Sequence, residues 1–263
     1  MRKKYLIIAL GLLLITSFVY GKSFSKLNNF DLAGGSEQVN REFPQRQIVD
    51  LVSLFPDTFF RQMATKEKKI ALTFDDGPDN YYTVQILDVL KRENIPATFF
   101  VIGQRCNDNP EVVKRIHDEG HILGNHSFSH PNFLKLTPEK IIKELNGTDE
   151  KINNLAGYKP AFFRSPYGSL DADKLKLVAS QGYKIIAWNV DSLDWQGLSA
   201  SEVKNNILSN TIEGSIVLQH SAGGKGEDLS GTVTALSEII TTLKKQGYEF
   251  VTVDKLLNLP YKK

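Results

Sequence analysis

The sequence predicts an α/β fold in which parallel strands carry helices on their outer side, as either an open doubly wound sheet or a barrel. From Lys69 onward, short runs rich in β-branched and aromatic residues alternate with amphipathic segments of helix length. Glycines stand where the predicted helices should stop, so that each helix ends where the next strand begins. Repeated strand and helix units of this kind are typical of parallel sheets.

The composition is that of a globular protein. The chain has 263 residues, of which 41% are hydrophobic and 24% charged, which excludes disorder, collagen-like repeats and a multi-span membrane protein. Lys and Arg number 32 against 30 Asp and Glu, and without the three basic residues of the leader the basic count is 29. No nucleic-acid partner is therefore expected.

Residues 1–21 have the layout of a secretory signal peptide. Residues 2–4 are basic and precede an apolar run over residues 5–20, and Val19 and Gly21 offer a small-residue cleavage site. The alternative is an uncleaved N-terminal membrane anchor. Either way the sequence predicts export to an extracellular or cell-wall location.

The single cysteine, Cys106, excludes an intramolecular disulfide. We interpret it as a passive, half-buried residue rather than a thiol nucleophile.

The chain divides into four predicted parts: the leader, a polar stalk with one or two helical turns over 22–66, a main domain over 67–258 and a tail over 259–263. Within the main domain, Thr137 and Pro138 form a good N-cap and first-turn pair. The seven predicted strands are 70–74, 97–101, 121–124, 161–163, 184–188, 215–219 and 249–253. The six predicted helices are 83–93, 110–119, 137–155, 171–181, 199–210 and 232–246.

The first strand runs into Asp75 and Asp76. Adjacent carboxylates repel each other unless a cation neutralises one of them, so the pair predicts a nearby metal ion or guanidinium. An ordinary turn at the Asp76-Gly77-Pro78 segment is the alternative.

The third strand is followed by His126 and His130. On one helical turn this spacing would put both imidazoles on the same face, within reach of one ion. Together with one carboxylate they would leave coordination positions open for water, as a catalytic metal needs. Exposed or core histidines are the alternative.

Arg164 follows the fourth strand and is suited to hold Asp75 ionised, with a surface ion pair as the alternative. After the fifth strand, Asp191 and Asp194 each offer a carboxylate to orient an imidazole. Trp195 would line a groove of sugar size, or lie in the core.

The sixth strand runs directly into His220, which beside a carboxylate such as Asp194 would act as a general acid. Leu218 on the same strand would supply an apolar wall. His117 and His121 fall in a helix and at a strand start, and we interpret both as structural.

The side chains predicted to carry chemistry follow the ends of predicted strands: Asp75, Asp76, His126, His130, Arg164, Asp191, Asp194 and His220. In a parallel barrel those ends share one face, where barrel enzymes build their active sites. The segments therefore predict one pocket with the character of a hydrolytic or metal site.

These five segments, in this order, resemble the polysaccharide deacetylases with a NodB-like domain, carbohydrate esterase family 4. The resemblance covers roughly residues 68–257. It implies a distorted (β/α) barrel of about seven parallel strands, in agreement with the seven strands predicted above. It also implies metal-dependent removal of acetyl groups from amino sugars of chitin-like polymers or peptidoglycan, or from acetylated xylan.

By this resemblance Asp76, His126 and His130 bind a divalent metal, expected to be zinc, with cobalt or another divalent ion as the alternative. The metal would polarise the acetyl carbonyl and lower the pKa of its bound water. Asp75 becomes the general base, and Arg164 holds it.

The same resemblance makes His220 the acid that protonates the leaving amine, with Asp194 tuning it. The backbone N–H of Tyr167 would join the metal in stabilising the oxyanion. Leu218 and Trp195 would contact the acetyl methyl group and the sugar.

The expected partner is an acetylated cell-wall polysaccharide, and a monomer is expected. The paired Asp75 and Asp76 resemble members acting on N-acetylglucosamine more than the muramic-acid type, in which the second Asp is commonly Asn.

Two other functions use the same features. Two histidines and one carboxylate also bind Fe(II) in oxygenases, although those sites usually sit on a double-stranded β fold. A wall-binding protein without turnover is the other alternative, and substitution of Asp75 would distinguish it.

Overall fold

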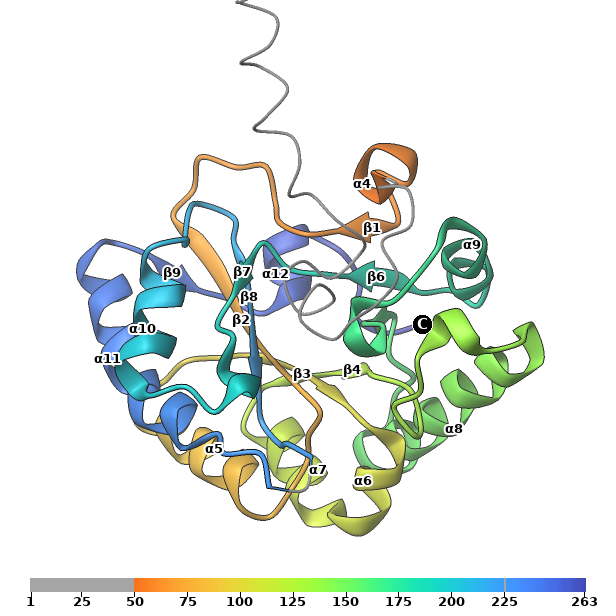
Figure 1. Ribbon diagram of the computed structural model, residues 1–263, viewed down its shortest axis with the longest axis horizontal. Coiled ribbons are helices and arrows are strands. Elements are labelled where there is room, and N and C mark those ends of the chain that lie inside the picture. Colours follow the sequence, from red (N-terminus) through yellow and green to blue (C-terminus); the bar gives the residue numbers. More distant parts are fainter. Residues whose placement is uncertain (1–49, 225) are drawn as a thin grey trace, which may run out of the picture.

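Nine strands with parallel pairing form the centre of the molecule over residues 50–224 and 226–263, the part of the chain that the computed structural model describes (Figure 1). Neighbouring strands follow the order β1-β6-β5-β4-β3-β2-β8-β7, and β9 pairs with β2. The strands are Phe59–Phe60 (β1), Lys69–Asp75 (β2), Thr98–Val101 (β3), Ile122–Asn125 (β4), Phe162–Phe163 (β5), Lys184–Ile186 (β6), Val190–Asp191 (β7), Ile216–His220 (β8) and Glu249–Phe250 (β9).

One continuous stretch of chain closes the sheet into a ring. Its first part, β6, pairs with β5, and its last part, β7, pairs with β8. Between them the N–H of Ala187 donates to Phe60 O over 2.7 Å, and that of Asn189 to Ile216 O over 3.3 Å. The distorted (β/α) barrel is thus confirmed, with all seven predicted strands present and two short strands, β1 and β7, in addition.

Alternate residues of β2 pack on its two sides. Leu72 and Phe74 belong to the apolar cluster formed with helices α5 (Tyr82–Glu93) and α11 (Ser230–Lys245), while Ala71 belongs to the cluster that contains Leu218 and Phe163. Because side chains alternate along a strand, Asp75 lies on the same side as Ala71. The carboxylate of Asp75, the last residue of the strand, therefore lies on the side of the sheet where Ala71 packs with Leu218 and Phe163.

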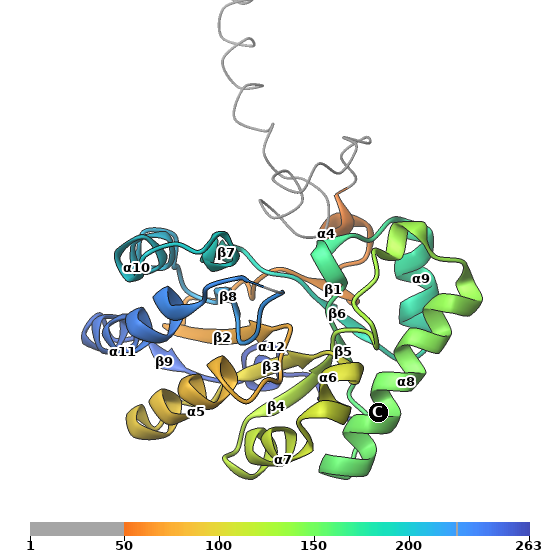
Figure 2. The same cartoon turned by 60° about the horizontal axis from the view of Figure 1, so that its bottom comes forward.

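Helices surround the strands, with α5 and α11 on one side and α8 and α9 on the other in both views (Figures 1 and 2). All six predicted helices are present: Tyr82–Glu93 (α5), Pro110–Asp118 (α7), Pro138–Ala156 (α8), Ala172–Ser180 (α9), Ala200–Leu208 (α10) and Ser230–Lys245 (α11). The described residues add three short helices, Leu51–Leu54 (α4), Gly103–Asp108 (α6) and Val253–Leu257 (α12), and three 3₁₀ turns, Phe133–Lys135 (η2), Pro166–Gly168 (η3) and Asp194–Gln196 (η4).

Both ends of the described chain pack against the barrel, and α4 is a helical turn of the kind predicted for residues 22–66. Residues 50–66 contribute α4 and β1 to the barrel, and the N–H of Met63 donates to Gly214 O over 2.9 Å. The tail residue Tyr261 accepts the N–H of Ala161 over 2.8 Å. Short pieces at the two ends therefore complete the edges of the sheet.

The predicted leader and the first part of the stalk, residues 1–49, lie outside the described residues. Over the described ranges, none of the helices combines the length and the apolar character that crossing a membrane requires.

Cys106 lies on α6, a helix that the sequence did not predict. Its side chain is fully buried rather than half-buried, and burial raises the pKa of its thiol to about 12. The thiol is therefore unsuited to act as a nucleophile, in agreement with the passive role predicted for it.

Candidate active site and metal centre

The residues predicted to carry chemistry meet at the carboxyl ends of the strands. Asp75 ends β2 and pairs in register with His220, which ends β8. His126 directly follows β4, and Arg164 directly follows β5. The parallel pairing of the strands places these ends side by side, as expected because the carboxyl ends of the strands in a parallel barrel share one face.

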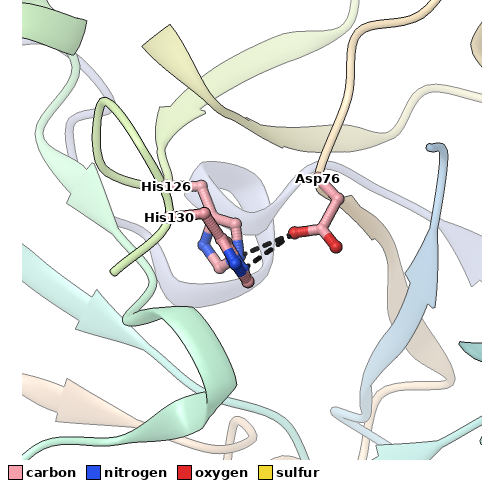
Figure 3. Close-up of side chains that lie close together, drawn as sticks. All are labelled: Asp76, His126 and His130. Carbon is pink, nitrogen blue, oxygen red and sulfur yellow. Dashed lines mark ion pairs between the residues drawn. The ribbon is translucent and has the colours of Figure 1, made fainter. Parts of the chain in front are cut away.

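Asp76, His126 and His130 form a cluster in which one donor atom from each lies within 4.8 Å of the others (Figure 3). The Nε2 atoms of His126 and His130 lie 3.2 and 3.1 Å from the same oxygen, Oδ1 of Asp76. This is the set of three ligands that the sequence predicts for a metal.

The hydrogen bonding of His126 makes this cluster suitable for a cation. The carbonyl of Arg164 lies 2.8 Å from Nδ1 and can only accept, so Nδ1 carries the proton and Nε2 presents a lone pair toward Asp76. The buried Oδ1 of Asp76 has no hydrogen-bond donor among the described residues. Two imidazole nitrogens and a carboxylate oxygen are ligands that zinc accepts, so the residues fit a divalent ion.

The electrostatics agree with that fit. Burial opposes ionisation of Asp76, but the imidazoles of His130 and His126 outweigh it and hold the pKa of the carboxyl well below its usual range. Burial likewise opposes protonation of His126, but the carboxylates of Asp75 and Asp76 outweigh it and raise the pKa of that imidazole. Both shifts show that the two carboxylates favour positive charge at this place, where a cation would sit.

The two histidines do not lie on a helical turn, so the geometry predicted for them is wrong. Residues 126–130 form a loop, in which Ser127 and His130 have φ angles of 68° and 58°. Left-handed residues interrupt a right-handed helix. Asp76 also has a positive φ, 68°, so three residues at this centre adopt backbone conformations that non-glycine residues rarely take.

Asp75 is held by Arg164, as predicted. The Nη1 of Arg164 donates to Asp75 Oδ1 over 2.7 Å, and both side chains are nearly fully buried. The other carboxylate oxygen, Oδ2, lies 3.8 Å from His126 Nε2 and therefore points toward the metal cluster. Arg164 is itself fixed by Thr73 Oγ1 at 2.8 Å and by the carbonyl of Ile186 at 2.9 Å.

His220 is held by Asp194 at two points. The Nδ1 of His220 donates to Asp194 Oδ1 over 2.7 Å, and its backbone N–H donates to Oδ2 over 2.9 Å. Thr232 Oγ1 donates to the same Oδ2 over 2.7 Å. Burial of Asp194 opposes ionisation, but His220 and these hydrogen bonds outweigh it and keep the pKa of the carboxyl below its usual value.

Asp191, the other acid considered beside His220, has different partners. Its Oδ1 accepts the N–H of Leu193 over 2.9 Å, and its Oδ2 lies 3.3 Å from Trp188 Nε1. Asp194 is therefore the carboxylate that orients the imidazole.

A pocket of about 400 Å³ opens from the cluster. The ring of Tyr167, in η3, packs edge-on against His130 with 4.6 Å between ring centroids. Leu218 is fully buried on β8 and Trp195 is half-buried in η4, and neither lines this pocket. The lining residues are Asp76, Ile102, Gln104, Arg105, Asp108, Ser129, His130, Tyr167, Gly224 and Glu227.

Three supporting residues were missed by sequence reasoning. Thr73 contacts Arg164, Thr232 contacts Asp194, and Glu144 contacts the loop between the two histidines. Each lies at an ordinary position of a strand or helix, so no local pattern marks it.

The comparisons with known proteins agree with this arrangement. The family model described as polysaccharide deacetylase matches residues 62–186. A peptidoglycan-N-acetylglucosamine deacetylase of Bacillus cereus is 46% identical over 188 residues, which are 72% of this chain and 68% of that protein. The chain belongs to the polysaccharide deacetylase family.

Two further members of this family, carbohydrate esterase family 4, extend the likeness. The crystal structure of the Bc1960 peptidoglycan N-acetylglucosamine deacetylase, solved with a hydroxamate-type small molecule, matches with a TM-score of 0.77 at 41% identity, covering 80% of this chain and 98% of that one. The peptidoglycan-N-acetylmuramic acid deacetylase PdaA of Bacillus subtilis is 36% identical over 230 residues, which are 85% of this chain and 84% of that protein. Polysaccharide deacetylases are hydrolases, and the fold and enzyme class predicted from the sequence are confirmed.

Proposed function

We propose that this deacetylase removes N-acetyl groups from N-acetylglucosamine units of peptidoglycan, with chitin-like oligomers as the alternative substrate. The observation that carries the proposal is the pairing of Asp75 with Arg164 and of His220 with Asp194 around one Asp-His-His cluster. A base, an acid and a ligand set together form a complete hydrolytic arrangement.

Asp76, His126 and His130 would hold the divalent ion, which we propose to be zinc. When bound there, the ion supplies Lewis-acid polarisation of the acetyl carbonyl and a water of lowered pKa.

Asp75 is the general base in this proposal. Its Oδ2 faces the cluster while Arg164 occupies Oδ1, so one oxygen remains directed at the place where a proton must be taken up. The buried guanidinium keeps the carboxylate in one orientation.

His220 is the general acid. Because its Nδ1 donates to Asp194, the proton that it transfers to the leaving amine is the one on Nε2. The backbone N–H of Tyr167, a residue whose ring packs against His130, is proposed as a donor to the oxyanion. Contacts of Leu218 with the acetyl methyl group and of Trp195 with the sugar remain predictions.

Two features favour N-acetylglucosamine over N-acetylmuramic acid. The second residue of the acidic pair is Asp76, whereas the muramic-acid type commonly has Asn at this position. In addition, the relative with 46% identity is named for N-acetylglucosamine, whereas the relative named for N-acetylmuramic acid is 36% identical.

The proposed place of action is the cell wall outside the membrane. The basic and apolar leader supports export, either with cleavage or as a membrane anchor. We further propose that the protein acts as a monomer.

The test is acetate release from peptidoglycan and from N-acetylglucosamine oligomers, after chelation and then with zinc or cobalt restored. We expect release that disappears on chelation, returns with metal and falls about 10²- to 10⁴-fold in Asp75→Asn. Mass analysis of the digested glycan identifies which amino sugar lost its acetyl group.

Three results would count against the proposal. Release that survives exhaustive chelation contradicts the metal centre, and loss of acetyl groups from muramic acid alone contradicts the substrate. Wall binding without acetate release under any metal, unchanged by Asp75→Asn, would indicate a non-catalytic relative.

A further inference from the structure

In the loop that carries His126 and His130, most backbone N–H groups donate a hydrogen bond to a defined partner. The N–H of Ser127 donates to Asn125 Oδ1 over 2.8 Å, and that of His130 donates to Ser127 Oγ over 3.0 Å. The loop contains two non-glycine residues with positive φ, each costing about 1–3 kcal/mol unless surrounding contacts compensate. The loop conformation therefore depends on the groups around it.

The N–H of His126 donates to Val101 O over 3.0 Å, and the other two N–H groups of the loop point to one side chain, Glu144 of α8. Its Oε2 accepts the N–H of Phe128 over 2.9 Å and that of Ser129 over 2.7 Å. Its Oε1 accepts the Ser129 hydroxyl over 2.8 Å. Hydrogen bonds to an ionised acceptor are roughly twice as strong as neutral ones, so this single carboxylate is a strong clamp on the loop.

Helix α6 holds the loop from the opposite side. The first N–H groups of that helix, on Gly103 and Gln104, donate to the carbonyls of Ser127 and Phe128 over 3.0 and 2.8 Å. The Phe128 ring fills a slot between two glycines: a Cβ on Gly103 would lie 2.6 Å from the ring, and one on Gly147 would lie 2.9 Å from it. The loop thus lies in a closely fitted space between α6 and α8.

We propose that Glu144 is a positioning residue that keeps His126 and His130 at the separation that binding of one metal ion requires. It contacts neither histidine directly but fixes the two peptide groups between them. Nothing in the local helical pattern of α8 requires a carboxylate at this place. The inference rests on the proposed metal centre, and it predicts an effect on metal affinity in the absence of any substrate.

The experiment compares Glu144→Ala with Glu144→Gln in the full chain. Alanine removes all three acceptor contacts, whereas the glutamine amide oxygen can accept both N–H groups while its NH₂ donates to the Ser129 hydroxyl. Zinc affinity is measured by competition with a chelator, and the visible spectrum of the cobalt form reports the coordination geometry. The matched control is Glu150→Ala, at an exposed position of the same helix.

We expect Glu144→Ala to bind zinc about 10- to 100-fold more weakly, as is typical when a group that orients a ligand is lost, and to alter the cobalt spectrum. Glutamine should restore affinity to within a few-fold of the wild type, and Glu150→Ala should match the wild type. Thermal unfolding of the metal-free proteins separates this effect from a general loss of stability. If alanine prevents folding, Ser129→Ala, which removes a single contact, should still weaken zinc binding measurably.

Wild-type zinc affinity in Glu144→Ala would overturn the inference, as would a glutamine variant as weak as the alanine variant. A wild-type protein that binds no zinc would instead overturn the proposed metal centre. A wild-type protein that binds zinc but releases no acetate would overturn only the proposed function.

Discussion

At the scale of single residues, the barrel end is built from buried charges, each tied to a partner. Asp75, Arg164 and Asp194 are at most 3% exposed. Removing one member of such a pair leaves the other as an uncompensated buried charge. The side chains at this centre therefore act as coupled units, and substitutions within a unit will not be additive.

The pair of Asp194 and His220 gives the first prediction. Asp194→Asn removes the negative charge beside the imidazole and places an NH₂ group where an acceptor is needed, so we expect kcat/KM to fall by about 100-fold or more. Asp173→Asn, at a carboxylate whose side chain is 94% exposed, is the control and should leave kcat/KM unchanged. Equal activity of the two variants would contradict the role given to Asp194.

His121 gives a prediction on pH and stability. Its Nδ1 accepts the N–H of Ala97 over 3.1 Å, and burial lowers the pKa of the imidazole from 6.5 to about 4. As pH falls from about 6.5 to 4, the unfolded chain therefore takes up a proton that the folded chain excludes, and the free energy of unfolding decreases by up to about 3 kcal/mol. Above pH 6.5 this group has no effect on stability.

The measurement is urea unfolding at several pH values for the wild type and for His121→Asn, which keeps an acceptor for the Ala97 N–H. We expect the wild type to lose more stability than the variant between pH 7 and 4. Parallel curves for the two proteins would show that His121 protonates freely in the folded state.

At the scale of elements, the strongly patterned segments could be predicted and the short ones could not. The predicted helices and strands lie in the regular alternation of strand-like and helix-length runs, whereas β1 and β7, two residues each, fall outside it. β5 and β9 are equally short, but they were predicted as parts of the longer runs 161–163 and 249–253. Two residues show no alternation, and such strands exist because neighbouring strands offer unpaired backbone groups. Their positions follow from the closed sheet and not from the local sequence.

The candidate site shows the same limit. Residue types and their places after strand ends were sufficient to predict one pocket in which Arg164 lies beside Asp75 and a carboxylate such as Asp194 lies beside His220. The choice of Asp76, His126 and His130 as the ligand set came from the family resemblance. The loop carrying His126 and His130 was predicted as a helical turn, because a spacing of four residues suits a helix and gives no sign of positive φ angles. The supporting contacts of Thr73 and Thr232 depend on tertiary structure, so neither residue could have been predicted.

The end of the chain gives a prediction at this scale. Lys263 Nζ lies 2.8 Å from Asp149 Oδ2, and Asp149, which is 4% exposed, also contacts Asn125 and Tyr183. Lys263→Met should lower the free energy of unfolding by about 2 kcal/mol or more, because it leaves a buried carboxylate without its cation. Lys255→Met, at a side chain that is 76% exposed, should change it by less than about 0.5 kcal/mol.

Thermal or urea unfolding measures both changes. Equal stability of the two variants would mean that the packing of the chain end onto α8 contributes little.

At the scale of the whole molecule, a second link in the ring lies where the segment after β1 meets the residues before β8. Gly214 has a φ of 78°, and a Cβ there would lie 1.9 Å from Met63 O. Its N–H donates to Lys69 O over 2.8 Å, and its carbonyl accepts from Met63 N over 2.9 Å. One glycine thus joins the chain around residues 63–69 to the start of β8, about 150 residues later in the sequence.

Gly214→Ala should therefore destabilise the protein by several kcal/mol, because Met63 cannot keep its place. Gly157→Ala is the matched control: its φ is 76°, but no atom lies within 4 Å of the added methyl group, so only about 1–2 kcal/mol of backbone strain is expected. Unfolding midpoints of the two variants measure the difference. A similar loss of stability in both variants would mean that the contact between residue 214 and Met63 relaxes at no cost in free energy.

The burial of Cys106 also makes the molecule convenient for spectroscopic labelling. With a thiol pKa of about 12, roughly one molecule in 10⁵ carries a thiolate at pH 7, so maleimides and iodoacetamides should leave the native protein unmodified. A cysteine introduced at an exposed position such as Tyr81, which is 62% exposed, would then be the single reactive thiol. A fluorophore attached there would label one position without any need to remove the natural cysteine.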